Sequence, residues 1–253
     1  MTGSRPVALI TGASRGIGAA ACRRLAAAGW DVAAAHEPTE EMGTMATALA
    51  DELSSDGAAV RAYAADLRDP EAVDALVARV LGDFGRLDAL VPNAAVDRIT
   101  PWLDIPLAEW DLTMDVNVRA AWLLARAGHD ALAASPLGSI VLVSSTMART
   151  GQPGRLHYSV SKAALLGMAR TLAREVGGEG IRVNAVMPGA IRTESETERF
   201  GTGIDDDVIA TQALARRGLA EDVANAINFL VSADSSFVTG QVLSVDGGAT
   251  FAS

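Results

Sequence analysis

The chain has 253 residues, of which 49% are apolar, and this is enough for the core of one large α/β domain. Its formal net charge is −10 at pH 7, and an acidic surface repels phosphate backbones, so we expect no nucleic-acid partner. No apolar run is long enough to span a bilayer, the first residues lack signal-peptide architecture, and the single Cys22 allows no intrachain disulfide, so we expect a cytoplasmic protein.

Short apolar runs alternate with helix-like stretches over nearly the whole chain. The runs that predict strands are residues 7–10, 31–35, 59–64, 87–91, 139–143, 182–186 and 242–245, and the stretches that predict helices are residues 18–28, 39–55, 69–83, 106–134, 158–176 and 220–232. This alternation predicts an α/β fold with a doubly wound, Rossmann-type parallel sheet of about seven strands and helices on both faces. Because no linker or repeat interrupts the pattern, we expect residues 1–253 to form one dinucleotide-binding catalytic domain. Ligands of such sheets bind beyond the carboxyl ends of the strands.

The loop after the first predicted strand, residues 11–18, reads Thr-Gly-Ala-Ser-Arg-Gly-Ile-Gly. Its glycines let the backbone turn sharply and approach a pyrophosphate with no Cβ in the way. The helix that follows directs its free N–H groups and the positive end of its dipole at such an anion. A tight turn that packs a helix on a strand would need similar glycines. The loop favours a dinucleotide because of its place between the first strand and the first helix.

Asp66 follows the third predicted strand and precedes Asp69-Pro70, where a helix is predicted to start. Its carboxylate could accept a hydrogen bond from the amino group of an adenine. An aspartate that forms a turn or a helix N-terminus explains the same position equally well. The sequence leaves both interpretations open.

Three polar residues suggest acid–base chemistry at the carboxyl edge of the sheet. Ser145 ends the fifth predicted strand, and Tyr158 and Lys162 follow at i and i+4 on one predicted helix, so they share a face. A free tyrosine has a pKa of about 10, and a neighbouring cation lowers the pKa by stabilising the phenolate. Such a pair occurs by chance on many helices. The conjunction with Ser145 and a phosphate loop is what favours catalysis.

Together these residues resemble the short-chain dehydrogenase/reductase family, in its single-domain form, over essentially the full chain. The T-G-x-x-x-G-x-G loop matches at residues 11–18, and the serine and the Y-x-x-x-K motif match at Ser145, Tyr158 and Lys162. The resemblance implies that Tyr158 is the acid–base residue, that Lys162 lowers its pKa and binds the nicotinamide ribose, and that Ser145 orients the carbonyl. It also implies that Asn117 holds a water in a proton relay that reaches Lys162.

The resemblance further implies contacts with the cofactor along this edge. Asp66 matches the family's adenine-contacting aspartate, residues 188–193 match the segment that packs on the nicotinamide carboxamide, and residues 246–248 match the common C-terminal ending. The expected cofactor contacts are Gly12, Ser14, Arg15, Gly16, Ile17, Gly18, His36, Asp66, Leu67, Asn93, Ala94, Tyr158, Lys162, Pro188, Gly189, Ile191 and Thr193. We expect no metal site.

One motif departs from the family pattern. The family usually has Asn-Asn-Ala-Gly after the fourth strand, whereas this chain has Pro92-Asn93-Ala94-Ala95. Pro92 removes a backbone donor, and Ala95 adds a methyl group near the cofactor. We expect a slightly altered nicotinamide side with activity retained.

The end of the second strand favours NADP(H) over NAD(H). An acidic residue there would bind the ribose hydroxyls and repel a 2′-phosphate. This chain has His36 where NAD-using relatives carry aspartate, and Arg15 resembles the basic residue of NADP-using relatives. Glu37 argues for NAD unless its side chain turns outward.

The substrate is less well specified than the cofactor. The overall pattern is nearest to the 3-oxoacyl-carrier-protein reductases, which dock an acidic carrier on basic residues. The stretch 128–139, expected near the site mouth, has no Lys or Arg, and Glu179 follows the next helix. We therefore rank a small-molecule carbonyl or alcohol level with, or slightly above, a carrier-bound substrate. Residues 194–212, which are polar, are the expected lid.

Four residues are expected to contact the substrate: Ser145, Met147, Arg155 and Tyr158. Arg155 lies three residues before the tyrosine, in a loop that forms one wall of the pocket by resemblance. Its guanidinium can bind a carboxylate or phosphate bidentately. The alternative is an exposed loop arginine, paired with an acidic residue of the lid.

Other classes of protein fit the sequence less well. A non-catalytic, cofactor-sensing protein would have little reason to keep Ser145, Tyr158 and Lys162 together. A sugar epimerase or dehydratase of the longer type would need a substrate domain that this length lacks, and enoyl reductases widen the Tyr-to-Lys spacing. Residues 110–134 and 158–176 are too apolar for one side to face solvent, which predicts a homotetramer.

Overall fold

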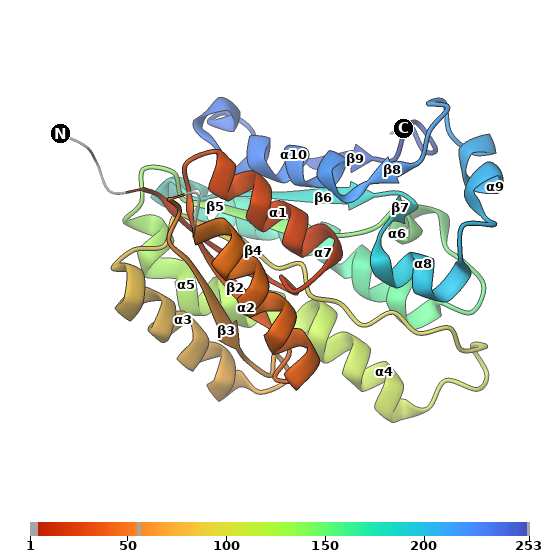
Figure 1. Cartoon of the computed structure of the whole chain (residues 1–253), viewed down its shortest axis with the longest axis horizontal. Helices are drawn as coiled ribbons and strands as arrows, with labels where there is room; N and C mark the ends of the chain where they lie inside the picture. Colours follow the sequence, from red (N-terminus) through yellow and green to blue (C-terminus); the bar gives the residue numbers. More distant parts are fainter. Residues whose placement is uncertain (1–4, 55–56, 252–253) are drawn as a thin grey trace.

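The computed structural model describes residues 5–54 and 57–251, and a parallel sheet of seven strands forms its centre (Figure 1). The strands are β1 (Val7–Thr11), β2 (Asp31–His36), β3 (Val60–Ala64), β4 (Ala89–Val91), β5 (Ser139–Val143), β6 (Arg182–Pro188) and β9 (Val242–Val245). Their order in the sheet is β3-β2-β1-β4-β5-β6-β9. The order reverses between β1 and β4, and this switch point is where a doubly wound sheet binds its ligand. The predicted fold is confirmed.

Two layers of helices cover the two faces of the sheet. One layer consists of α1 (Gly16–Ala27), α2 (Glu40–Ser54) and α10 (Ala220–Val231), and the other of α3 (Pro70–Phe84), α5 (Ala120–Ala133) and α7 (Leu156–Val176). Successive side chains of a strand point to opposite faces, so Ala8 and Ile10 belong to the first core and Val7 and Leu9 to the second. Burial on both faces explains why the inner strands read as continuous apolar runs, whereas the edge strands β3 and β9 are only partly buried.

The stretch 106–134, predicted as one helix, is interrupted. Helix α4 (Leu107–Met114) passes into a turn of π-helix at Asp115–Arg119, and α5 begins at residue 120. The apolar pattern runs through all three parts, so it cannot reveal the extra residue that a π-helical turn inserts. Asn117 lies in this turn and is 2% exposed. The interruption therefore falls on a predicted catalytic residue.

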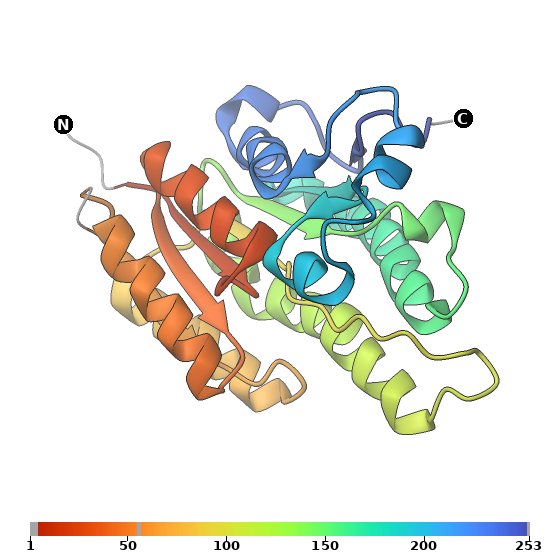
Figure 2. The same ribbon diagram turned by 45° about the vertical axis from the view of Figure 1, so that its right-hand side comes forward.

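Small elements beyond the carboxyl edge were not predicted individually. They are α6 (Met147–Thr150), β7 (Ile191–Arg192), α8 (Glu194–Phe200), α9 (Asp205–Ala210) and β8 (Gly218–Leu219), and β7 pairs with β8 in a two-stranded sheet. Residues 194–212, which we name the lid segment, contain α8 and α9. Figure 2 shows α8 (cyan) beside the start of α1 (red).

A few sequence predictions fall on residues outside the described part: the N-terminal residues 1–4, residue 55 at the predicted end of the second helix, and residues 252–253. Cys22 is fully buried in the first core, as expected for a small apolar residue. Within the described residues, no helix is both long and apolar enough to cross a membrane.

Candidate active site

The phosphate loop is tied to the end of β4 by four hydrogen bonds. The Thr11 hydroxyl accepts from the backbone N–H groups of Asn93 (3.0 Å) and Ala94 (3.1 Å). The Asn93 side-chain amide donates to the carbonyls of Thr11 (2.9 Å) and Gly12 (3.2 Å). Pro92 offers no backbone donor here, and its carbonyl accepts from Val143 N at 3.2 Å. The two strands at the switch point are thus fastened side by side.

Two glycines of the loop have no substitute. Gly12 has φ of +64°, a left-handed conformation that favours glycine. A Cβ on Gly18 would lie 2.1 Å from the Gly12 carbonyl oxygen and 2.8 Å from Asn93 Nδ2. The backbone of the loop therefore folds directly against the first turn of α1. This cradle, which a Cβ would fill, fits the pyrophosphate of a dinucleotide.

The lid segment contacts the phosphate loop through two carboxylates. Gly16 N donates to Glu194 Oε2 at 3.0 Å, and Arg15 Nη1 lies 3.2 Å from Glu198 Oε2. A carboxylate accepts from the same kind of N–H group that would bind a phosphate oxygen. The Thr193 hydroxyl, at the start of this segment, accepts from Glu196 N and caps α8.

At the end of β2, the exposure of His36 differs from what the sequence led us to expect, and that of Glu37 agrees with it. His36 is only 8% exposed, and its Nδ1 lies 2.8 Å from the Glu37 carbonyl oxygen. Glu37 is exposed, as the NADP argument required. Of the two basic side chains expected near a 2′-phosphate, Arg15 is the one whose guanidinium reaches the surface.

Asp66 forms a turn after β3. Its carboxylate accepts from the backbone N–H of Arg68 at 2.9 Å and from the Arg68 guanidinium. These hydrogen bonds hold the pKa of the Asp66 carboxyl below its ordinary value. The turn interpretation thus describes the contacts that Asp66 makes, and the adenine contact stays a prediction.

The segment expected to pack on the nicotinamide begins where β6 ends. Gly189 N donates to the Val245 carbonyl at 3.0 Å, and a Cβ on Gly189 would lie 2.7 Å from the Asp246 Cβ. The Asp246 carboxylate accepts from Gly248 N at 3.0 Å and closes the C-terminal turn. The Pro188-Gly189 and Asp246-Gly247-Gly248 motifs therefore pack against each other.

The predicted catalytic residues meet at the end of β5. The Ser145 hydroxyl lies near enough to the Tyr158 hydroxyl to lower its pKa, and Lys162 Nζ lies 5.7 Å from the centre of the tyrosine ring. Lys162 Nζ donates to the Val143 carbonyl at 2.8 Å. Asn117 Nδ2 donates to Ser161 Oγ at 3.0 Å, which joins the π-helical turn to α7. One strand end and two helices therefore converge on the tyrosine.

Burial dominates the electrostatics of this group. It raises the pKa of Tyr158 to about 12, with Asp97 as the second cause, while the nearby Ser145 hydroxyl opposes the rise. Burial also lowers the pKa of Lys162 to about 8. The sequence predicted a lowered tyrosine pKa because it shows the cation and not the desolvation. Tyr158 is thus held in its protonated form.

The wall before Tyr158 carries charges that the sequence did not reveal. Arg155 is 6% exposed, so it is not the exposed loop arginine of the alternative interpretation. Its Nη1 lies 3.2 Å from Asp97 Oδ2 and 3.6 Å from the sulfur of Met147. Asp97 comes from the loop after β4, and not from the lid. Nothing in its local sequence marks it as a site residue.

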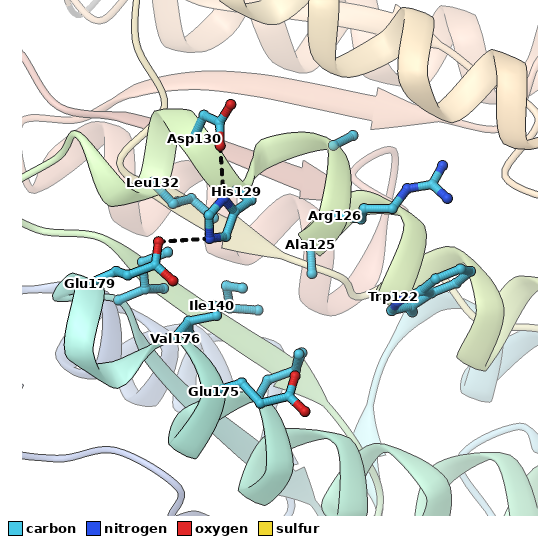
Figure 3. Close-up of a pocket in the computed structure, with 13 residues that line it drawn as sticks. Trp122, Ala125, Arg126, His129, Asp130, Leu132, Ile140, Glu175, Val176 and Glu179 are labelled. Atoms are coloured by element: carbon cyan, nitrogen blue, oxygen red, sulfur yellow. Dashed lines mark hydrogen bonds and ion pairs between the residues drawn. The ribbon is translucent and has the colours of Figure 1, made fainter.

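A separate cavity of about 480 Å³ lies between α5 and α7, away from the tyrosine (Figure 3). His129 lies 2.8 Å from Asp130 Oδ1 and 3.0 Å from Glu179 Oε2 at its rim. The expectation that residues 128–139 lie near the mouth of the active site is wrong for the site of the same chain. These residues connect the end of α5 to the start of β5. The start of β5 lies at the opposite edge of the sheet from Ser145, which follows the end of this strand.

No metal centre competes with this site: within residues 5–54 and 57–251, no group of three or more His, Cys, Asp or Glu side chains could hold a metal ion. The glycine cradle at the switch point and the Ser-Tyr-Lys group beside it define a dinucleotide-dependent oxidoreductase.

Known proteins agree with that class. Residues 12–250 match a family model described as enoyl-(acyl carrier protein) reductase. A 3-oxoacyl-[acyl-carrier-protein] reductase from Synechocystis sp. is 35% identical, with 96% of each chain covered. A blue fluorescent protein from a metagenomic library, solved with NADPH, has a TM-score of 0.89 at 38% identity and covers 97% of this chain and 98% of its own. A short-chain dehydrogenase from Burkholderia cenocepacia, solved with NADP, gives 0.89 and 38%, with 96% and 97% covered. The chain belongs to the short-chain dehydrogenase/reductase family.

Proposed function

We propose that this protein is an NADP(H)-preferring reductase of small-molecule carbonyl compounds, and an alcohol dehydrogenase in the reverse direction. The observation that carries the proposal is the convergence of Ser145, Tyr158 and Lys162 at the end of β5, at the edge that holds the glycine cradle. The bound nicotinamide supplies or accepts the hydride. A panel of ketones and alcohols, assayed with both cofactors, tests the proposal, and failure to turn over any of them with either cofactor would refute it.

The protein's own residues handle the proton. Tyr158, protonated at neutral pH, donates its hydroxyl proton to the substrate oxygen as the hydride reaches the carbon. Ser145 hydrogen-bonds the same oxygen and orients it. The Lys162 ammonium stabilises the phenolate that remains. Asn117 fixes the loop after β4, because its side chain accepts from Val96 N at 2.7 Å and donates to Val96 O at 3.0 Å.

The pKa of Lys162, about 8, predicts a pH limit on reduction. Below that value the lysine is charged and stabilises the phenolate, and above it the charge is lost. Tyr158 stays protonated throughout, because its pKa is about 12. We expect kcat/KM for ketone reduction to be level below pH 7 and to fall about tenfold per pH unit well above pH 8. A constant kcat/KM from pH 6 to pH 10 would remove Lys162 from the mechanism.

The preference for NADP(H) rests on Arg15 and the outward-facing Glu37. The two solved relatives named above were bound to NADPH and NADP, which supports the same cofactor here. Glu198, 3.2 Å from Arg15, competes for the guanidinium that would bind the 2′-phosphate. Both charges are exposed, so the pair itself is weak.

Cofactor preference can be tested at both ends of that pair. Arg15→Ala should weaken NADPH binding by about tenfold or more and leave NADH binding nearly unchanged, because a charge-assisted contact to phosphate is lost. Glu198→Gln should tighten NADPH binding and not NADH binding. Dissociation constants from nicotinamide fluorescence decide the matter. Equal effects on both cofactors, or tighter wild-type binding of NADH, would contradict the preference.

Reduction of a carrier-bound 3-oxoacyl group is the second candidate. The name of the Synechocystis relative favours it. The lid segment argues against it, since Glu194, Glu198, Asp206 and Asp207 are exposed there and would repel an acidic carrier protein. The four-residue spacing of Tyr158 and Lys162 argues against an enoyl reductase. We therefore favour a substrate that diffuses free.

We also propose that the enzyme is a cytoplasmic homotetramer of single-domain subunits. Apolar side chains are exposed on α5 and α7, before α4 and at its first residue: Trp102 (68%), Leu107 (74%), Trp122 (47%), Leu156 (43%) and Val160 (39%). Surfaces of this kind usually mark a contact with another chain. Light scattering at micromolar concentration should give about four times the 26.1 kDa chain mass. A stable monomer would contradict the tetramer.

A further inference from the structure

Asp97 joins three parts of the molecule that are far apart in sequence. Its backbone position is fixed by the neighbouring Val96, which Asn117 holds from both sides. Its Oδ2 lies 3.2 Å from Arg155 Nη1 on one side and 3.0 Å from Arg199 Nη1 on the other. Arg199 Nη2 also donates to the Asp97 backbone carbonyl at 2.8 Å. One carboxylate thus links the loop after β4, the start of α7 and the end of α8.

The surroundings of this cluster are partly closed to solvent. The side chain of Arg155 is 7% exposed, that of Asp97 28% and that of Arg199 39%. The centre of the Phe200 ring lies 5.8 Å from Arg155 Cζ and 5.9 Å from Arg199 Cζ. Ion pairs with restricted access to water are screened less than surface pairs, so the contact of Asp97 with the buried Arg155 is screened less than its contact with the exposed Arg199.

The base of the lid segment is fastened independently. Arg217, whose side chain is 4% exposed, donates to both oxygens of Glu196 at 2.6 and 2.7 Å and to Asp205 Oδ1 at 2.5 Å. These contacts hold α8 and α9 against β8. The contacts of Asp97 with Arg199 hold the far end of α8, which carries Arg199 and Phe200.

Two polar atoms in the cluster are buried without a hydrogen-bond partner among the described residues: Asp97 Oδ1 and Arg155 Nε. An unpaired buried acceptor or donor costs stability, so such a pair suggests a role beyond holding the fold. Both belong to residues whose charges act on Tyr158.

The charges that act on Tyr158 come from three segments: Asp97 from the loop after β4, Arg155 from the residue before α7, and Arg199 from α8. Asp97 raises its pKa and Arg155 and Arg199 lower it, while the polar neighbour Ser145 also lowers it. Lys162 lies on the same helix. His157 and Glu109 form a separate pair, 3.2 Å apart, between α7 and α4. When α8 is closed, Arg199 offsets the Asp97 charge, and without Arg199 that charge acts on the tyrosine more strongly.

We propose that Asp97 is a positioning residue that latches α8 over the catalytic tyrosine through Arg199, and that this latch tunes proton transfer at Tyr158. Closure of the lid segment then does two things at once. It covers the substrate, and it brings a positive charge to the carboxylate that opposes ionisation of the tyrosine. The proposal rests on the proposed role of Tyr158, but its test does not need turnover.

The chain has two tyrosines, Tyr63 and Tyr158, which makes a direct test possible. Labelling tyrosine with carbon-13 at Cζ gives two signals, assigned by their loss in Tyr63→Phe and Tyr158→Phe. Asp97→Asn removes the charge at nearly constant shape, and the Tyr158 titration should move about one pH unit lower. Tyr63, which donates to Asp83 at 2.7 Å, should titrate as before. Asp97→Glu should keep the wild-type position.

Arg199→Gln tests the latch itself. We expect less Tyr158 phenolate than in the wild type at pH 11, and hydrogen exchange of the α8 amides about tenfold faster. Arg216→Gln is the matched control, since it breaks an exposed pair with Asp222 (2.7 Å) and should change neither quantity. An unmoved Tyr158 titration in Asp97→Asn, or unchanged α8 exchange in Arg199→Gln, would overturn the proposal. If Asp97→Asn does not fold, Arg199→Gln alone decides it.

Discussion

Tyr158→Phe is expected to lower kcat for ketone reduction by about 10² or more, with cofactor binding nearly unchanged. The substitution deletes the hydroxyl that donates the proton and keeps the ring that packs near Lys162. A phenylalanine cannot act as the acid, and the Ser145 hydroxyl keeps its contact with Met147 N. The measurements are steady-state kcat and the Kd of NADPH.

Tyr63→Phe is the matched control. It removes the other tyrosine hydroxyl of the chain, which lies on the edge strand β3, away from the end of β5, and donates to Asp83 at 2.7 Å. Its kcat should stay within a factor of two of the wild type. If Tyr158→Phe keeps near-normal turnover, tyrosine is not the proton carrier and the mechanism fails.

Gly18→Ala is expected to weaken binding of either nicotinamide cofactor by about 100-fold. The new Cβ would lie 2.1 Å from the Gly12 carbonyl oxygen, and a backbone atom cannot rotate out of the way as a side chain can. The loop must move away from α1, which costs about 1–3 kcal/mol and distorts the cradle that receives the phosphates. Because the defect lies in cofactor binding and not in hydride transfer, raising the cofactor concentration should restore part of the turnover rate.

Gly82→Ala provides the comparison for that variant. Gly82 lies in α3, and a Cβ there would meet nothing within 4 Å. Since alanine favours a helix over glycine, this variant should bind cofactor normally and unfold at the same or a higher temperature. Wild-type cofactor affinity in Gly18→Ala would show that the loop does not cradle the phosphates.

The sequence predicted all seven strands of the main sheet, because the inner strands are buried on both faces and read as apolar runs, and the partly buried edge strands β3 and β9 continue the alternation with helices. It predicted Ser145, Tyr158 and Lys162 as one group because their spacing places them at one edge of such a sheet, and the structure brings them together. The missed small elements, α6 and the β7–β8 pair, are too short to leave a periodic pattern. The π-helical turn at Asn117 was missed because its apolar pattern continues that of its flanking helices.

Long-range charge was harder to predict than the fold. Asp97 and Arg199 are 102 positions apart, and neither lies in a recognisable motif. Arg155 was noticed, but its burial and its partner depend on where the loop after β4 folds. The expected lowering of the tyrosine pKa failed for the same reason, since desolvation is a property of the packed site and not of the Tyr-Lys spacing.

Transfer of deuterium from cofactor to product tests the central claim most directly. The protein would be incubated with NADPH that carries deuterium on the transferred position and with a panel of small ketones, followed by mass spectrometry of the alcohols. The account predicts one deuterium on the carbinol carbon with at least one ketone, faster with NADPH than with NADH, and almost none with Tyr158→Phe. Absence of labelled alcohol from every ketone with both cofactors, or equal labelling by Tyr158→Phe, would contradict it.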